Sequence, residues 1–207
     1  PNRRATSMIL ELIKSSLNGD EVDTKAFKNA TSRDWNTFLK IANQTSVTGV
    51  VLDSVHKLPK GTVPSEVVLK MMDYTQDIEK AHAKQEKIIG ELSEKFGKLG
   101  AETIQLKGIG LSMDYPVPQH RYGGDIDIFT RLKGTVTEER SNSSNMIDDM
   151  LHSQGFEIDD YNLARVKHSE FMYDGVRIEN HRFFVNKEAL TEAKLVDSVL
   201  HKTLDPV

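Results

Sequence analysis

The stretch that decides the fold is QLKGIGLSMDYPVPQHRYGGDIDIFT, which spans residues 105–130. Near its end, acidic and apolar side chains alternate, which is the period of a half-buried strand. Such a strand turns Ile126 and Ile128 toward the core and directs Asp125 and Asp127 together out of the sheet. Two adjacent carboxylates repel each other, and a hard divalent cation removes that repulsion. Without metal, neutralising one aspartate should therefore barely affect the fold. Taken alone, the pattern also fits the commoner case of an edge strand with solvated aspartates.

Two glycine-containing turns lie next to this strand in the sequence. Lys107 and Gly108 follow a predicted strand at residues 102–106 and open a predicted short helix. Glycine lets the backbone approach a phosphate, and the amide groups at a helix start favour anions. Gly123 and Gly124 directly precede the acidic strand, where they let the chain bring a large ligand close to the carboxylates. Both turns favour a site for a phosphorylated ligand.

A third carboxylate is expected on a neighbouring strand. Residues 166–173 and 176–184 flank Asp174-Gly175, a dipeptide typical of a hairpin turn. In the second of these strands, Glu179 lies on the face opposite the apolar side chains. Three carboxylates on adjacent strands would complete a two-metal site.

Together these motifs resemble the DNA-polymerase-β-type nucleotidyltransferase superfamily, and more closely an uncharacterised bacterial branch of it. The resemblance covers residues 101–184, with weaker similarity in the helices before them. Three features depart from the usual superfamily pattern: Lys-Gly replaces the first glycine pair, the interval to the acidic strand is long, and the third acid is glutamate. The matching motifs are Leu106-Lys107-Gly108, Tyr115-Pro116, Arg121, Gly124–Ile128 and Glu179-Asn180-His181.

The resemblance implies an α+β fold, with a small mixed β-sheet of polymerase-β-type nucleotidyltransferase architecture and an N-terminal helical region. Amphipathic patterns predict helices at 5–17, from Ser32 onward and over 65–99. A polar loop is predicted at 131–144, followed by a helix at 146–154. The expected division is a helical region at 1–100 that packs on the core, a nucleotidyltransferase core at 101–186, and the start of a C-terminal helical region at 187–207.

The resemblance also implies a reaction. A nucleoside monophosphate, expected to be AMP from ATP, moves to an unidentified hydroxyl acceptor and pyrophosphate leaves. Mg²⁺ or Mn²⁺ would be held by Asp125, Asp127 and Glu179, the three catalytic residues. Glu179 would also help to deprotonate the acceptor.

Five further residues are candidates for binding the nucleotide or the acceptor. Lys107 and the amide of Gly108 would hold the triphosphate, and the guanidinium fork of Arg121 matches two phosphate oxygens. Gly124 would allow the ligand to approach the backbone closely. His181 shares the face of Glu179 in a regular strand, so it either touches substrate or is a surface histidine bonded to a neighbour.

Two alternatives stay open. The first is a catalytically inactive nucleotide-binding or interaction module of the same fold. The second is an enzyme that acts on nucleic acid, such as a terminal transferase. The net charge of -4 and the lack of a basic stripe with interleaved aromatic residues both make nucleic acid an unexpected partner.

Composition excludes several other classes of protein. The 207 residues contain no cysteine, which excludes disulfides, zinc–thiolate sites, iron–sulfur clusters and thiol nucleophiles. A membrane-spanning helix needs about 20 apolar residues, and the sequence has no such stretch. We therefore expect a cytoplasmic protein without a membrane partner.

Several other polar or aromatic residues are expected to have structural roles. His120 is interpreted as an ordinary loop residue. The acidic residues Glu157, Asp159 and Asp160 are interpreted as a solvated turn. The aromatic and apolar side chains Trp35, Phe38 and Leu39 recur at helical spacing, which is typical of a buried helix face.

Overall fold

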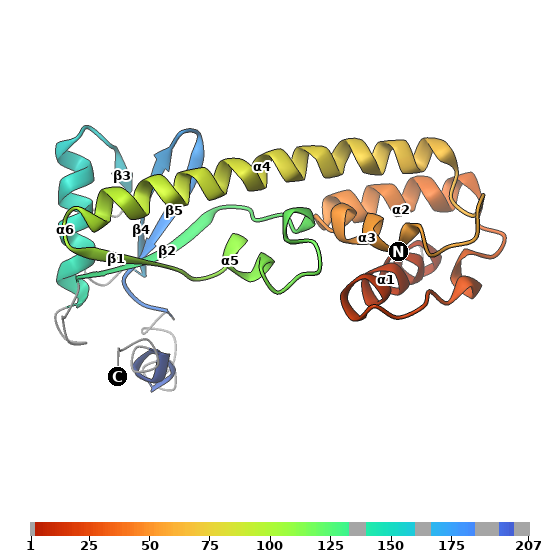
Figure 1. Cartoon of the computed structure of the whole chain (residues 1–207), viewed down its shortest axis with the longest axis horizontal. Helices are drawn as coiled ribbons and strands as arrows, with labels where there is room; N and C mark the ends of the chain where they lie inside the picture. Colours follow the sequence, from red (N-terminus) through yellow and green to blue (C-terminus); the bar gives the residue numbers. More distant parts are fainter. Residues whose placement is uncertain (1–2, 133–139, 160–166, 185–194, 201–207) are drawn as a thin grey trace. The chain divides into compact units, whose positions relative to one another are not determined.

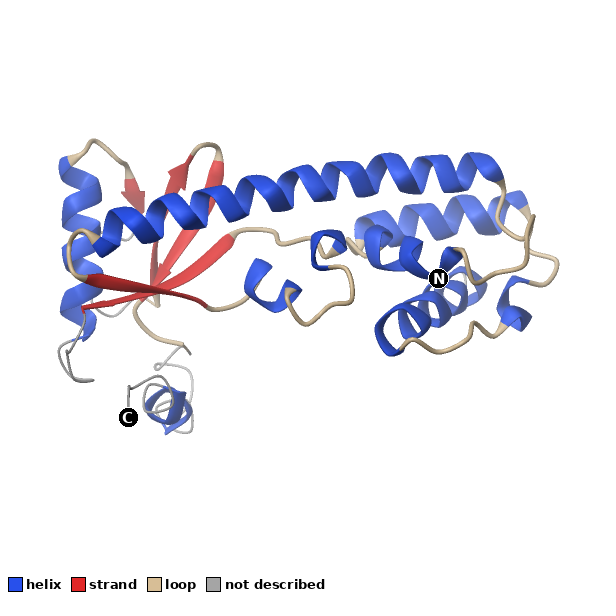
Figure 2. Cartoon of the chain, in the orientation of Figure 1, coloured by secondary structure: helices blue, strands red, loops and turns tan. Residues whose placement is uncertain are grey.

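The computed structural model describes residues 3–132, 140–159, 167–184 and 195–200. These residues form helices and one five-stranded sheet, which confirms the predicted α+β class (Figures 1 and 2). The helices are α1 (Arg3–Asn18), η1 (Thr24–Phe27), α2 (Ser32–Gln44), α3 (Thr48–Val55), α4 (Ser65–Gly97), α5 (Ile109–Ser112), η2 (Pro118–His120) and α6 (Arg140–Ser153). The strands are β1 (Ala101–Gln105), β2 (Ile126–Leu132), β3 (Ile158–Asp159), β4 (His168–Tyr173) and β5 (Val176–His181).

The chain forms two compact units, which we call the helical unit and the sheet unit. The helical unit contains the residues up to Lys84 together with Leu111–Gly123. The sheet unit contains Gln85–Gly110 and the described residues from Gly124 onward. Helix α4 therefore contributes residues to both. The domain boundaries predicted at residues 100 and 186 divide the chain in sequence order, and they stay a prediction.

The helical unit is built on amphipathic helices that share one core. Helix α1 buries Met8 and Leu12, and α2 buries Trp35 and Phe38. The rings of Trp35 and Phe38 meet edge to face at 5.3 Å, and Leu39 is also buried, so this predicted core face is confirmed. Helix α2 begins at Ser32, after a capping box in which Thr31 is the N-cap residue.

Helix α3 approaches η2 closely within the helical unit, and Gly49 permits that approach. A Cβ atom at Gly49 would lie within 3.0 Å of the backbone and Cβ of His120. The His120 ring contacts Asp53 Oδ1 at 2.5 Å and Glu79 Oε1 at 3.0 Å. His120 is therefore a half-buried residue that joins η2 to α3 and α4, and not an ordinary loop residue.

Replacing Gly49 by alanine should destabilise the protein. The added methyl group must displace backbone atoms of η2, and overpacking of this kind costs about 1–3 kcal/mol. Gly90 in α4 is the matched control, because a Cβ there meets nothing within 4 Å. Gly90→Ala should raise the unfolding free energy by about 0.4–1 kcal/mol. Urea denaturation gives the unfolding free energy of both variants. A change of the same sign and size in the two variants would contradict the close contact between Gly49 and His120.

The sheet unit contains a mixed sheet with the strand order β1-β2-β5-β4-β3. The central pair, β2 and β5, is parallel, and every other neighbouring pair is antiparallel. Residue Asp127 of β2 lies opposite Glu179 of β5 in this register. The sheet thus places two of the predicted acidic residues side by side.

One face of this sheet is covered by helices. Ile126, Ile128 and Ile178 point toward α6 and the C-terminal part of α4, which flank the strands in Figure 1. The helices contribute Ile88, Leu92, Phe96, Ile147 and Leu151 to the same core. Because side chains alternate along a strand, Asp127 and Glu179 lie on the opposite face.

Some element boundaries differ from the prediction. The predicted loop at 131–144 is wrong at both ends, because residues 131–132 extend β2 and residues 140–144 begin α6. The rest of that loop lies outside the described residues. Of the helix predicted from residue 187, the described part, 195–200, is helical. No described helix has the length and apolar character needed to cross a membrane.

Candidate functional site

Two carboxylates form the centre of the candidate site. Asp127 and Glu179 occupy paired positions on the parallel strands β2 and β5, and both are buried, with 1% and 9% of their surface exposed. Two acids in such positions need positive charge or protons nearby, because burial penalises their ionised form. The cationic groups around the two acids therefore determine how readily each acid ionises.

Lys107 supplies the first of these groups. Its Nζ lies 2.7 Å from Asp127 Oδ1 and 4.0 Å from Glu179 Oε2. The backbone N–H of Leu106 donates to the carbonyl of Asp127 at 3.1 Å, and this bond carries the end of β1 alongside β2. The side chain of Lys107 is half exposed, so its ammonium group can meet both the acids and a ligand from solvent.

His181 supplies the second group. It follows Glu179 by two residues on β5 and thus shares its face. Its Nε2 lies 2.9 Å from Asp127 Oδ1 and 3.2 Å from Glu179 Oε2. The side chain is buried, with 1% exposed, so the alternative of a surface histidine is wrong.

These contacts give the two acids different proton affinities. Burial raises the pKa of Asp127, but hydrogen bonds from His181 and Lys107 outweigh it and lower that pKa to about 2. Burial and the neighbouring Asp127 raise the pKa of Glu179. The hydrogen bond to Asp127 raises the pKa of Lys107. Asp127 is therefore ionised, while Glu179 holds a proton more readily, which suits an acid that receives a proton during a reaction.

Asp125 lies just before β2 and is only partly buried. Its charge helps to raise the pKa of Lys107, although Asp127 contributes more. The predicted repulsion between Asp125 and Asp127 is not the main feature of the site, since Lys107 and His181 compensate Asp127 without a metal. Ligation of a cation by Asp125 stays a prediction.

The two predicted glycine turns adopt the left-handed backbone conformation that favours glycine. Gly108 has φ of 62° and Gly124 has φ of 72°. The carbonyl of Gly124 accepts a hydrogen bond from Gln85 of α4, which fixes the entry into β2. Helix α5 after Gly108 has only four residues, so its dipole contributes less to anion binding than the sequence suggests. Phosphate binding by these glycines stays a prediction.

Arg121 belongs to the helical unit. Its guanidinium carbon lies 5.6 Å from the centre of the Tyr115 ring, within the range of a cation–π contact. Both residues are among the matching motifs. The role of Arg121 in phosphate binding stays a prediction.

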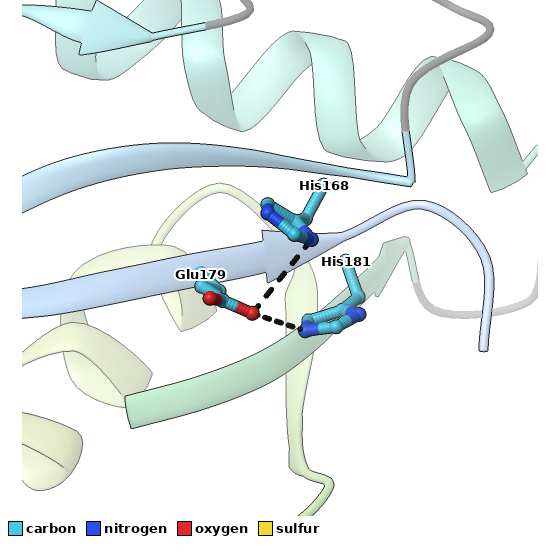
Figure 3. A group of neighbouring side chains, drawn as sticks. All are labelled: His168, Glu179 and His181. Atoms are coloured by element: carbon cyan, nitrogen blue, oxygen red, sulfur yellow. Dashed lines mark hydrogen bonds and ion pairs between the residues drawn. The ribbon is translucent and has the colours of Figure 1, made fainter. Parts of the chain in front are cut away.

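Two polar residues of β4 that the sequence motifs do not indicate lie beside the acids. His168 lies opposite His181, and Glu170 lies opposite Glu179, in the antiparallel pair β4–β5. The turn at Asp174-Gly175 held this signal, because counting back from a two-residue turn pairs these positions. Figure 3 shows His168 and His181 directed at Glu179. The ligand atoms of His168, Glu179 and His181 all lie within 4.8 Å of one another.

Behind the sheet, a buried polar network holds β5 and β4 to α6. Arg182 Nη2 donates to Asp148 Oδ2 at 2.7 Å, and both side chains are fully buried. Asp148 Oδ1 also accepts from Ser169 at 2.8 Å and from Asn180 at 3.3 Å. Burial raises the pKa of Asp148 in spite of these donors. Because Asn180 and Arg182 alternate with Glu179 and His181, the network positions the strand that carries the site.

A cavity of about 450 Å³ adjoins Lys107 and His181, the two residues that contact the acids. Lys107, Lys167 and His181 line it together with apolar side chains such as Leu106 and Phe184. Lysines suit an anionic group, and the apolar wall suits a ring or an alkyl chain.

Of the residues interpreted as a solvated turn, Glu157 and Asp159 are exposed, and Asp160 lies outside the described residues.

Comparison with known proteins gives one match. Residues 31–207 match a family described as "Uncharacterised nucleotidyltransferase". This range covers most of the chain, including both the sheet with its acids and most of the N-terminal helices. No curated protein and no solved structure matches the chain.

Proposed function

The chain belongs to the uncharacterised nucleotidyltransferase family, and on that premise we propose that it moves a nucleoside monophosphate, AMP from ATP, to a hydroxyl acceptor with a divalent cation. The observation that carries the proposal is the pairing of Asp127 with Glu179 on β2 and β5, beside the ammonium group of Lys107. Nucleotidyl transfer needs oxygen ligands for a cation and a positive group for phosphates at one place.

The donor set fits a divalent cation. Asp125, Asp127 and Glu179 would hold Mg²⁺ or Mn²⁺, which favour carboxylate oxygens. Such an ion would bind phosphate oxygens and stabilise the charge that develops on the α-phosphate. Nδ1 of His168 lies 3.7 Å from Glu179 Oε2 and has no hydrogen-bond partner among the described residues, so the surroundings of Glu179 have capacity for a further ligand.

The chain's own residues would act as follows. The acceptor oxygen attacks the α-phosphorus in line as the bond to the bridging oxygen breaks, and pyrophosphate leaves. Glu179 receives the proton of the hydroxyl, as its raised pKa suits. Lys107 and the Gly108 amide hold the triphosphate, and the resemblance assigns Arg121 to phosphate binding as well. Gly124 lets the chain pass close to the ligand, while His181 holds Asp127 and Glu179 in place and faces the cavity.

A direct assay tests the reaction. The full chain is incubated with each of the four nucleoside triphosphates, labelled at the α-phosphate, with Mg²⁺ or Mn²⁺. The acceptors offered are small hydroxyl compounds, proteins and RNA, and the readouts are pyrophosphate release and the labelled product. Metal-dependent release with ATP supports the proposal. Transfer to RNA, with binding that weakens as salt rises, would instead favour the nucleic-acid enzyme.

A second candidate, an inactive nucleotide-binding module, has one observation in its favour. Lys107 already places a positive charge 2.7 Å from Asp127, which is the charge compensation that a metal would otherwise supply. Binding of Mg²⁺-ATP without pyrophosphate release would support this candidate.

Replacing Lys107 by methionine should distinguish the two roles of its ammonium group. If Lys107 holds the triphosphate, the variant loses a charge-assisted hydrogen bond worth about 1.5–3 kcal/mol, so KM for ATP should rise about 10- to 100-fold. If it only compensates Asp127, the variant should bind Mg²⁺ more tightly and keep its ATP affinity. Lys98→Met, at an exposed position 2.9 Å from Glu94, is the control and should change neither value.

A further inference from the structure

The side chain of His168 is held in one orientation by a carboxylate. Its Nε2 lies 3.0 Å from Glu170 Oε1, and Glu170 in turn accepts from Arg177 Nη1 at 3.3 Å. An ionised carboxylate only accepts hydrogen bonds, so Nε2 carries the proton in this pair. In the neutral ring the other nitrogen, Nδ1, then has a free lone pair.

That lone pair is directed at a second acceptor. Nδ1 of His168 lies 3.7 Å from Oε2 of Glu179, as Figure 3 shows. It is shielded from solvent and has no hydrogen-bond partner among the described residues. A lone pair and a carboxylate oxygen facing each other repel unless a cation or a proton lies between them.

The distances are close to those between ligands of one metal ion. Ligands about 2.0–2.1 Å from a tetrahedral Zn²⁺ stand about 3.3 Å from each other. From Glu179 Oε2, the nitrogens of His181 and His168 lie at 3.2 and 3.7 Å. All three ligand atoms lie within 4.8 Å of one another, so rotation of the side chains is needed to bring them to one ion. The link from His168 to Glu170 is also the contact that orients metal-binding histidines in proteins.

We propose that His168, Glu179 and His181 form a site for a divalent transition-metal ion of the Zn²⁺ class, distinct from a Mg²⁺ ion held by Asp125 and Asp127. Two imidazole nitrogens and one carboxylate suit Zn²⁺, Co²⁺ or Fe²⁺, whereas Mg²⁺ favours oxygen ligands alone. Three protein ligands leave a position open for a substrate oxygen. The inference rests on the proposed function in one respect, since Glu179 is assigned to both sites.

When a metal ion binds at this site, a cationic group still balances the negative charge of Asp127. His181 Nε2 must release its proton to solvent in order to bind the ion, which removes its hydrogen bond to Asp127. Lys107 remains 2.7 Å from Asp127 Oδ1. The transition-metal site can therefore fill without leaving a buried carboxylate unpaired.

Absorption spectroscopy with Co²⁺, used in place of Zn²⁺, tests the site without relying on turnover. Cobalt bound by histidine nitrogen in a four- or five-coordinate site absorbs visible light far more strongly than six-coordinate aqueous cobalt. The wild-type chain should develop such a band, Zn²⁺ should abolish it, and a large excess of Mg²⁺ should not. His168→Ala should lose the band, and Glu170→Gln should weaken Co²⁺ affinity about 10- to 100-fold.

The controls separate this inference from the proposed function. His56→Ala, at an exposed position in the helical unit, should leave the band unchanged. Asp127→Asn should keep the band while losing the response to Mg²⁺-ATP. Melting curves without metal check that each variant is folded, and Glu170→Gln, which preserves side-chain shape, serves if His168→Ala does not fold. A band that persists in His168→Ala, or a wild-type spectrum like that of aqueous cobalt, would overturn the site while leaving the Mg²⁺-dependent reaction intact.

Discussion

Replacing Asp127 by asparagine should lower nucleotidyl transfer by about a thousand-fold or more. The carboxylate is the predicted metal ligand nearest to Lys107 and His181. Its loss removes an anionic ligand and with it several kcal/mol of charge stabilisation in the transition state. Labelled pyrophosphate release, measured below the melting temperature of the variant, gives the rate.

The same substitution should also cost stability, contrary to the expectation from the sequence alone. Asp127 is not repelled by its neighbours but held by two hydrogen bonds, and the low pKa of about 2 reflects that favourable environment. Asparagine keeps an acceptor oxygen but loses the charge, so the cost should be about 1–3 kcal/mol. Asp159→Asn, at an exposed position on β3, is the matched control. Equal melting shifts with Mg²⁺-ATP in wild type and Asp127→Asn would contradict the metal site.

Replacing Asp148 by asparagine should produce the largest loss of stability. Arg182 would lose its carboxylate in a fully buried position, and arginine does not escape the cost by releasing its proton. Removing one partner of such a pair typically costs 3–5 kcal/mol. Urea denaturation followed by far-UV circular dichroism measures the change.

An exposed ion pair and a double variant complete this experiment. Asp77 pairs with Lys80 at 3.2 Å, with both side chains about three-quarters exposed, so Asp77→Asn should change stability by less than about 0.5 kcal/mol. Adding Arg182→Met to Asp148→Asn should restore part of the loss, because the buried charge is then gone. If the double variant is less stable than Asp148→Asn alone, the unpaired charge of Arg182 is not the cause of the lost stability.

The sequence predicted the strands of the site because their alternation is strong. The acidic–apolar pattern before Ile128 and the turn at Asp174-Gly175 identify β2 and the β4–β5 hairpin, and the resemblance orders them in one sheet. The family match and the mixed sheet confirm the predicted family and fold class. Local pattern and family motifs were sufficient for these features.

The partners of the acids could not be predicted in the same way. The motifs predict a phosphate as the partner of Lys107, yet its ammonium group lies 2.7 Å from Asp127, a contact that depends on how β1 pairs with β2. His168 and Asp148 come from segments with weak patterns, and their roles depend on which side chains face them across β4 and α6. Burial affects whether such groups are ionised, and a sequence alone does not show which of these side chains are buried.

The parallel pairing of β2 with β5 has a consequence for how the protein folds. Asp127 and His181 are 54 residues apart in the chain, whereas the β4–β5 hairpin closes through the two residues Asp174 and Gly175. Hairpins form within microseconds, but contacts between distant segments must first overcome a larger loss of chain entropy. The two histidines therefore meet early, while the acid pair is completed only when β2 docks. During synthesis on a ribosome, no metal can be held between Asp127 and Glu179 until nearly the whole sheet unit has emerged.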